Sequence, residues 1–123
     1  MKRDMELIRA MLLAVELYEP GDEAIAFEGY TDEQIGFHGY LLGEAGLAEV
    51  MDCTSLGDAV PMAEIRHLTW QGYEFLDAAR DDTVWKHAKD RLGAAGKSLL
   101  TVPLGVMTAL LIDEAKRRLG LTS

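Results

Sequence analysis

The chain has 123 residues, of which 49% are hydrophobic and 27% are charged. This length fits one domain with its own hydrophobic core, and the composition excludes a disordered or low-complexity chain. The single cysteine, Cys53, excludes an internal disulfide, and no apolar run reaches the roughly 20 residues of a membrane-spanning helix. We therefore expect a cytoplasmic protein without a membrane segment.

Acidic and basic residues are unevenly distributed along the chain. Residues 1–82 contain 18 Asp or Glu and five Lys or Arg, whereas residues 83–123 contain three and seven. A field this negative repels nucleic acid over the first two thirds of the chain and favours basic partners. Solubility alone is the alternative explanation of the acidic balance.

The first expected element is an amphipathic helix that begins after Asp4 and ends at Glu19-Pro20-Gly21. Its apolar residues recur at helical spacing, at Ile8, Met11, Leu12 and Val15. A short, half-buried strand is expected over residues 24–29, where apolar side chains alternate with smaller or charged ones.

The second expected helix has the clearest local signature in the chain. Thr31 and Gln34 can form a capping box, and Gly46 is placed to end the helix in a left-handed cap. The predicted core face consists of Ile35, His38, Leu41, Leu42 and Ala45, and we expect the His38 ring to be hydrogen-bonded at the edge of the core. The opposite face consists of Glu33, Gly36, Gly39, Tyr40, Gly43 and Glu44. No Lys or Arg lies between Thr31 and Gly46.

Two strands, at residues 48–53 and 62–67, are expected to form a hairpin of the kind called a wing. A helix over residues 73–80 should follow, with Thr69 as a plausible N-cap. The large apolar side chains around its start are expected to pack on the core; they are Trp70, Tyr73, Phe75 and Leu76.

Two further helices are expected near the end of the chain. Asp81, Asp82 or Thr83 can cap the first, which carries Trp85 on its core face and ends around residues 93–96. The last begins near Thr101 and Pro103 and ends at the basic residues 116–118, which suit a helix C-terminus. It is apolar on most sides, so it is buried or pairs with a second copy.

The predicted fold class is mainly α with a small β-hairpin (α+β). We expect a single domain over residues 1–123, in which a winged helix-turn-helix-like core over residues 1–68 precedes two to three C-terminal helices over residues 69–123.

Several segments resemble one known family over nearly the whole chain. They are residues 1–9 (MKRDMELIR), 30–38, 41–47 and 68–81 (LTWQGYEFLDAARD), with Val84, Trp85 and Lys89. They resemble domain of unknown function 2513, a family of short bacterial and phage proteins. The resemblance implies a winged-helix-like architecture and an association with phages and mobile elements, but no activity. Gly39 and Tyr40 depart from the larger apolar residue and lysine usual in the family, which weakens an expectation of phosphate contact.

Enzymatic chemistry is not indicated by the sequence. The three histidines, His38, His67 and His87, are far apart and have no Cys or carboxylate at metal-ligand spacing. No nucleophile motif or phosphate-binding glycine loop is present, and no pair of carboxylates has an obvious reason for a raised pKa. We therefore expect a protein that is not an enzyme, with no metal, cofactor or small-molecule substrate.

Protein recognition is the first functional hypothesis, with a partner or a second copy docked on the face that carries Glu33, Gly36, Gly39, Tyr40, Gly43 and Glu44. Glycine inside a helix costs about 1 kcal/mol relative to alanine, so three on one stripe indicate a close backbone approach. The approach is to a partner, with Tyr40 as the anchor. The alternative is that drift, or packing against a neighbouring strand of the same chain, explains the glycines.

DNA binding is the alternative, with residues 31–45 in the major groove and the wing near Asp58 on the backbone. It rests on analogy between folds, because the docking helix offers only acidic charges. An alternative basic face, made of Lys86, Lys89 and Arg91, could reach a duplex in a dimer. The sequence does not decide between a monomer and a homodimer.

Overall fold

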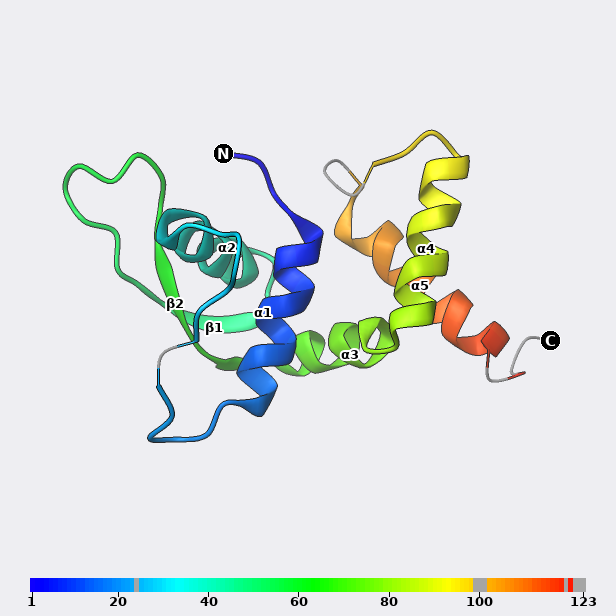
Figure 1. Cartoon of the computed structure of the whole chain (residues 1–123), viewed down its shortest axis with the longest axis horizontal. Helices are drawn as coiled ribbons and strands as arrows, with labels where there is room; N and C mark the ends of the chain where they lie inside the picture. Colours follow the sequence, from blue (N-terminus) through cyan, green and yellow to red (C-terminus); the bar gives the residue numbers. More distant parts are fainter. Residues whose placement is uncertain (24, 99–101, 119, 121–123) are drawn as a thin grey trace. The chain divides into compact units, whose positions relative to one another are not determined.

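The computed structural model describes residues 1–23, 25–98, 102–118 and 120. Among them are five helices and one antiparallel sheet of two strands (Figure 1), which confirms the predicted mainly helical α+β class. The chain divides into two compact units, Met1–Tyr73 and Glu74–Ser123. The division lies inside helix α3 (Trp70–Ala79), so the interpretation as one domain stays a prediction.

Helix α1 (Met5–Leu17) begins at the predicted cap. The Asp4 Oδ1 atom accepts hydrogen bonds from the backbone N–H groups of Glu6 and Leu7, at 2.9 and 3.3 Å. Its apolar face is fully buried at Leu7 and Leu12. The helix therefore forms the centre of the first unit's core, as its spacing predicts.

The strand expected over residues 24–29 is wrong for the described residues 25–29, and Ala24 lies outside the description. Residues 28 and 29 form a turn instead, and residues 25–27 have no regular secondary structure. The Tyr30 N–H donates to the Phe27 carbonyl at 3.3 Å, and Gly29 has a φ of 86°. A positive φ is a turn conformation that an extended strand does not contain, so the alternation of two apolar residues is cut short.

Helix α2 (Asp32–Glu44) has both predicted ends. The Thr31 hydroxyl accepts from the Gln34 N–H at 3.1 Å, and the Gln34 side chain accepts from the Thr31 N–H at 2.8 Å. At the other end, Gly46 has a φ of 73° and the Leu47 N–H donates to the Leu42 carbonyl at 3.0 Å. The positive φ of Gly46 and the bond from Leu47 to Leu42 belong to a Schellman motif, which turns the chain directly into the first strand.

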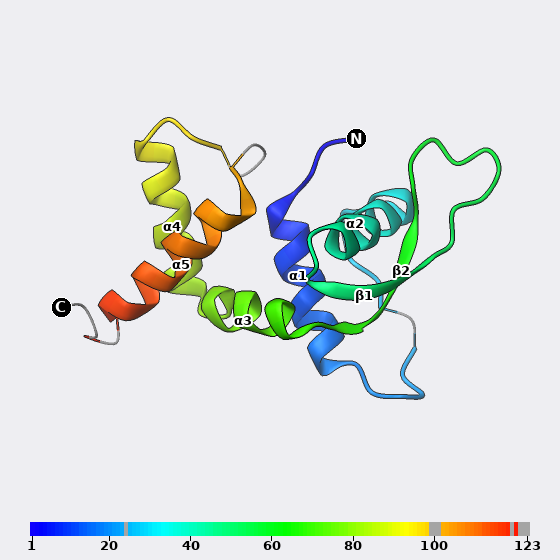
Figure 2. The ribbon, with the colours of Figure 1, turned by 180° about the vertical axis from the view of Figure 1, so that it is seen from behind.

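Strands β1 (Ala48–Asp52) and β2 (Ala63–Leu68) form the predicted antiparallel hairpin, with each boundary within one residue. An irregularity in register lies between Glu49 and Val50. The two views of the ribbon agree that α2 lies across this hairpin, beside α1 (Figures 1 and 2). Helix α1, helix α2 and the hairpin thus enclose the core of the first unit.

Thr69 caps α3 as predicted, because its hydroxyl accepts from the Gly72 N–H at 3.1 Å, but the helix begins at Trp70 rather than at residue 73. Phe75 and Leu76 are buried. The expectation that Trp70 and Tyr73 also pack on the core is wrong, because 77% and 43% of their surfaces are exposed. The buried residues of α3 form one stripe, made of Gly72, Phe75, Leu76 and Ala79, and Trp70 and Tyr73 lie outside it.

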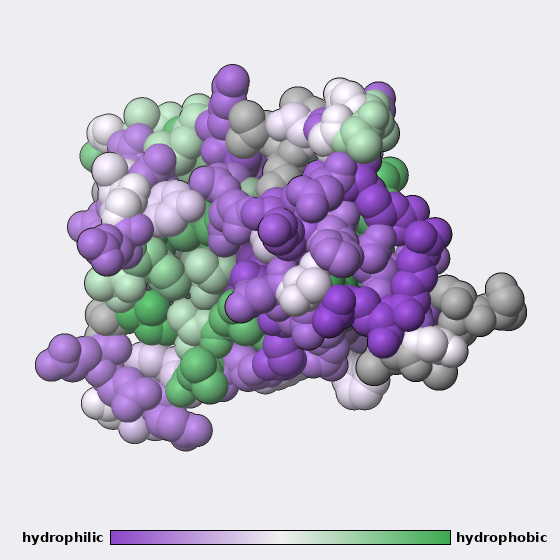
Figure 3. All heavy atoms as spheres, turned by 45° about the vertical axis from the view of Figure 1, so that its right-hand side comes forward, coloured by the Kyte–Doolittle hydropathy of each residue, from purple (hydrophilic) through white to green (hydrophobic). Residues whose placement is uncertain are grey.

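The second unit contains the paired helices α4 (Asp82–Ala94) and α5 (Leu104–Arg118). Asp81 caps α4, and Trp85 is 3% exposed, which confirms its predicted place in the core. The start expected near Thr101 lies outside the described residues; α5 begins directly after Pro103. The outer surface around α4 is hydrophilic (Figure 3). None of the helices in the described part of the chain is both long and apolar enough to cross a membrane.

Candidate functional site

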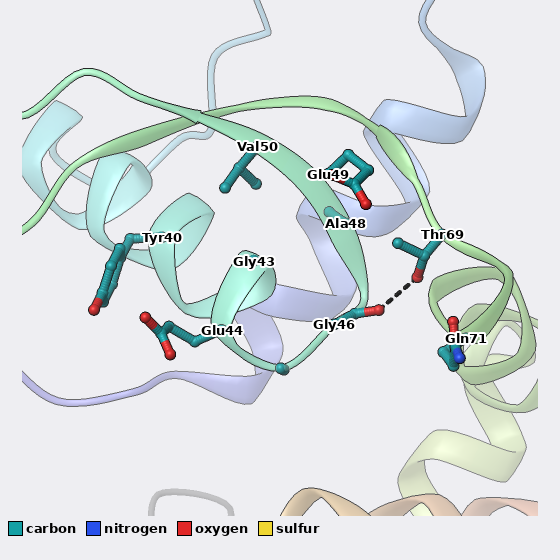
Figure 4. A pocket seen from close by; sticks show the side chains of 10 residues that line it. Tyr40, Gly43, Glu44, Gly46, Ala48, Glu49, Val50, Thr69 and Gln71 are labelled. Atoms are coloured by element: carbon teal, nitrogen blue, oxygen red, sulfur yellow. Dashed lines mark hydrogen bonds between the residues drawn. The ribbon is translucent and has the colours of Figure 1, made fainter.

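An open hollow of about 640 Å³ lies where the end of α2, the start of β1 and the start of α3 meet (Figure 4). We call it the acidic hollow. Its lining residues are Tyr40, Gly43, Glu44, Ala45, Gly46, Ala48, Glu49, Val50, Thr69 and Gln71. The only charged side chains among them are the two carboxylates of Glu44 and Glu49.

Tyr40 and Glu44 form the α2 side of the acidic hollow. The side chains of Tyr40 and Glu44 point toward one another (Figure 4), and hydrogen bonding to the Glu44 carboxylate, with its negative charge, raises the pKa of Tyr40 above its ordinary value. The Tyr40 ring also stacks on Phe37, with their centroids 6.3 Å apart. Tyr40 is therefore held at the edge of the hollow by contacts on two sides.

The start of α3 forms the opposite side. The Thr69 hydroxyl donates to the Gly46 carbonyl at 2.6 Å (Figure 4). The Thr69 N–H donates to the Leu47 carbonyl at 3.1 Å. Gly72 lies against that Leu47 oxygen, where a Cβ atom would overlap it. These bonds fix the α2–β1 turn to α3, so the walls of the hollow are set before any ligand arrives.

The glycine stripe of α2 faces the hairpin rather than a partner. A Cβ atom at Gly39 would overlap the backbone oxygen of Ala63, and one at Gly43 would lie 2.5 Å from a methyl carbon of Val50. At Gly36 it would overlap the end of the Met62 side chain. The three glycines therefore let α2 pack closely on the strands and on Met62 beside them, so internal packing explains the stripe.

This result corrects the predicted docking face, because Glu33, Gly36, Gly39, Tyr40, Gly43 and Glu44 do not form one exposed surface. Gly39 is buried, and Gly36 and Gly43 are partly covered, whereas Glu33 and Glu44 are exposed at opposite ends of α2. Only Tyr40, Gly43 and Glu44 line the acidic hollow. The spacing of residues shows which of them share a face of α2, but it does not show which face the hairpin covers.

The alternative basic face is also changed by the structure. The Arg91 guanidinium donates to Asp113 at 2.7 Å and to Glu114 at 3.0 Å, and these bonds raise its pKa. Arg91 therefore joins α4 to α5, and its charge is offset within the chain. Lys86 is exposed and Lys89 is partly exposed, so the face that Lys86, Lys89 and Arg91 were expected to form is reduced to two lysines.

His38 is buried and fully hydrogen-bonded, as the sequence predicts. Its Nε2 atom accepts from the Asp4 N–H at 2.8 Å, so Nδ1 carries the proton that is donated to the Gln34 carbonyl at 2.7 Å. Burial lowers the pKa of His38 below its ordinary value of 6.5. The Asp4 carboxylate in turn accepts from the Tyr30 hydroxyl at 3.2 Å. This cluster joins α1 to α2, and both ring nitrogens are occupied by structural bonds.

Metal ligands do not gather in the part of the chain that the structure describes: no group of three His, Cys, Asp or Glu side chains there could hold an ion. His67 and His87 lie in different units, the first with Nδ1 3.1 Å from the Leu68 carbonyl and the second 3.8 Å from the Glu114 carboxylate.

Comparison with known proteins places the chain in a family. The family model described as hypothetical protein DUF2513 matches residues 2–98. The chain belongs to the DUF2513 family. A Haemophilus influenzae (strain ATCC 51907 / DSM 11121 / KW20 / Rd) protein described as uncharacterized is 40% identical over 92 residues, which cover 72% of this chain and 76% of that protein. No solved structure matches the chain. The DUF2513 match contains the acidic hollow and ends before α5.

Two residues of the hollow, Glu49 and Gln71, are missed by sequence reasoning. They lie on β1 and at the start of α3, 22 residues apart, and neither belongs to a motif. Thr69 is the one signal in the sequence that could have located them. It is the predicted N-cap of the helix that carries Gln71, and its hydroxyl bonds at 2.6 Å to Gly46, the predicted turn just before β1.

Proposed function

We propose that this DUF2513 protein is a non-enzymatic recognition module of the winged-helix type, which binds a basic segment of a protein partner at the acidic hollow. The order α1, α2 and antiparallel hairpin supports the winged-helix interpretation. The association with phages and mobile elements that the resemblance implies stays a prediction.

One observation carries the choice of partner. Residues 10–65 contain 12 Asp or Glu and no Lys or Arg. This stretch includes all of α2, all of β1 and the hairpin loop, the elements that a winged helix places on DNA. Phosphate neutralisation by Lys and Arg dominates DNA affinity, so this surface lacks the groups that binding to DNA needs.

The chemistry of the acidic hollow fits a Lys or Arg side chain. Glu44 and Glu49 offer carboxylate oxygens, and Tyr40 offers an aromatic ring at the edge. A guanidinium pairs with carboxylates through charge-assisted hydrogen bonds and stacks on aromatic rings. Unit Met1–Tyr73 as a whole contains 14 acidic and four basic residues, so it attracts a basic partner and repels the same unit of a second copy.

Amide NMR with a tetra-arginine peptide tests this proposal. Titration should shift the amide signals of Glu44, Glu49 and Gln71 first, and a tetra-glutamate peptide should shift none of them. The double variant Glu44→Gln with Glu49→Gln should weaken binding about fivefold or more, given up to about 1 kcal/mol for each exposed ion pair. The double variant Glu28→Gln with Glu33→Gln removes two exposed charges of the unit that do not line the hollow, and serves as the matched control. Equal weakening by both variants would show diffuse attraction and refute the site.

DNA binding is the second candidate, and the position of α2 directly before the hairpin favours it. In that case the exposed Lys86 and the partly exposed Lys89 on α4 supply the phosphate contacts, outside the recognition helix. Lys86→Glu with Lys89→Glu would then abolish DNA binding, and the same double variant leaves tetra-arginine binding unweakened if the acidic hollow is the site.

A further inference from the structure

A second concave surface lies on the first unit, with none of its lining residues in common with the acidic hollow. It has a volume of about 800 Å³ and follows β2 from Met62 to Leu68, between α1, the start of α2 and the segment around Phe27. We call it the β2 groove. Figure 3 shows hydrophobic side chains gathered on this unit.

The floor of the β2 groove is apolar and comes from every element around it. Met11 and Val15 contribute from α1, Ile25 and Phe27 from the segment before α2, and Ile65 from β2. Two tyrosines, Tyr18 and Tyr73, line the groove with 44% and 43% of their surfaces exposed. Exposed aromatic side chains beside an apolar floor are typical of protein interfaces rather than of monomer surfaces.

The charged side chains that line the groove are mainly acidic. Glu16, Asp32 and Glu64 come from α1, α2 and β2, against one cation, Arg66. The surrounding unit has ten more acidic than basic residues. This charge disfavours the same unit of a second copy as the occupant, because like charges would face each other across the contact.

We propose that the β2 groove is a docking site for a partner protein's apolar segment flanked by Lys or Arg. The apolar side chains of that segment contact the floor between Phe27 and Ile65, and its basic residues pair with the acidic residues that line the groove. This goes beyond the proposed function, because the hollow recognises single cationic side chains whereas the groove buries apolar surface.

The probe is a fluorescent 14-residue peptide, the sequence Leu-Lys-Lys-Leu-Leu-Lys-Leu repeated twice, titrated with the full chain and followed by anisotropy. The same peptide with Glu in place of Lys is the charge control. We expect the lysine peptide to bind at least tenfold more tightly than the glutamate peptide. Equal affinities would overturn the charge argument and with it the proposal.

Two variants separate the groove from diffuse electrostatic attraction. Phe27→Ser keeps the charge of the chain and should weaken binding of the lysine peptide about tenfold. Leu56→Ser removes an apolar side chain of the hairpin loop that is fully exposed and lines no part of the groove, so it should leave affinity unchanged. Unchanged affinity of the Phe27 variant would overturn the proposal.

A measurement on the unaltered chain keeps the test independent of how Phe27→Ser folds. Three isoleucines, at 25, 35 and 65, line the groove, whereas Ile112 lies on α5 in the second unit. With labelled isoleucine methyl groups, the lysine peptide should shift the three groove signals and leave that of Ile112 in place. Backbone amides are labelled in the same sample. Unshifted groove methyl signals, with shifts only at amides of the acidic hollow, would overturn the groove while leaving the proposed function intact.

Discussion

The contact between α2 and the hairpin predicts opposite effects of one substitution at two positions on the same helix. Alanine is favoured over glycine inside a helix by about 1 kcal/mol. At Gly36 the new methyl group would meet the flexible end of Met62, which can move aside. Gly36→Ala should therefore leave stability unchanged or raise it by up to about 1 kcal/mol.

At Gly39 the new methyl group would meet backbone instead. It would overlap the Ala63 oxygen and lie 3.2 Å from the Ala63 carbonyl carbon, on a strand paired with β1. Overpacking costs about 1–3 kcal/mol, and a clash with backbone belongs at the upper end. After the gain in helix propensity, Gly39→Ala should lower the free energy of unfolding by about 1–2 kcal/mol.

Urea unfolding followed by circular dichroism measures both variants against the unaltered chain. Gly93→Ala on α4, where a Cβ atom would have no neighbour within 4 Å, gives the propensity effect alone and should stabilise by up to about 1 kcal/mol. A Gly39 variant as stable as the Gly36 variant would refute the close packing of α2 on β2.

Three further predictions concern buried groups, each measured by urea unfolding. Because burial lowers the pKa of His38, the unfolded chain takes up a proton below about pH 6.5 that the folded chain does not; stability present above pH 6.5 should fall as the pH is lowered toward 5.5, and fall less in His38→Gln. An equal loss in both proteins would contradict this. Trp85→Ala should cost about 3–5 kcal/mol because the indole is buried, and a loss under 1 kcal/mol would show that α4 packs loosely. Arg91→Met should cost about 1–3 kcal/mol, since it removes the 3.0 Å partner of the buried Glu114 carboxylate, and no loss would refute that pairing.

Local signals in the sequence predict most helix and strand ends of this fold. Asp4, Thr31 and Gly46 fix the ends of α1 and α2 because capping depends on a few neighbouring residues, which the sequence shows directly. The strand predicted before α2 is wrong for a related reason. The turn at Gly29 outweighs a two-residue alternation, and strand propensity depends on neighbours that the sequence does not place.

The candidate site is less predictable because it depends on contacts between distant residues. Gly39 carries no side chain to show which face of α2 it belongs to, and Ala63 lies 24 positions away. The sequence suggests that Arg91 is an exposed cation, because its partner Asp113 lies 22 residues later in the chain and only the fold brings the two together. Tyr40 is predicted as an anchor and lines the hollow. Glu49 lines the hollow only because the hairpin places β1 beside α2, which the sequence does not show.

Titration of the purified chain with mixed-sequence duplex DNA, at low and then moderate salt, tests the central claim of protein recognition most directly. Light-scattering mass recorded on the same samples reports self-association. We predict no DNA binding even at low salt, because residues 10–65 present no Lys or Arg. Tight binding that weakens steeply with salt would contradict the claim and favour the DNA-binding alternative.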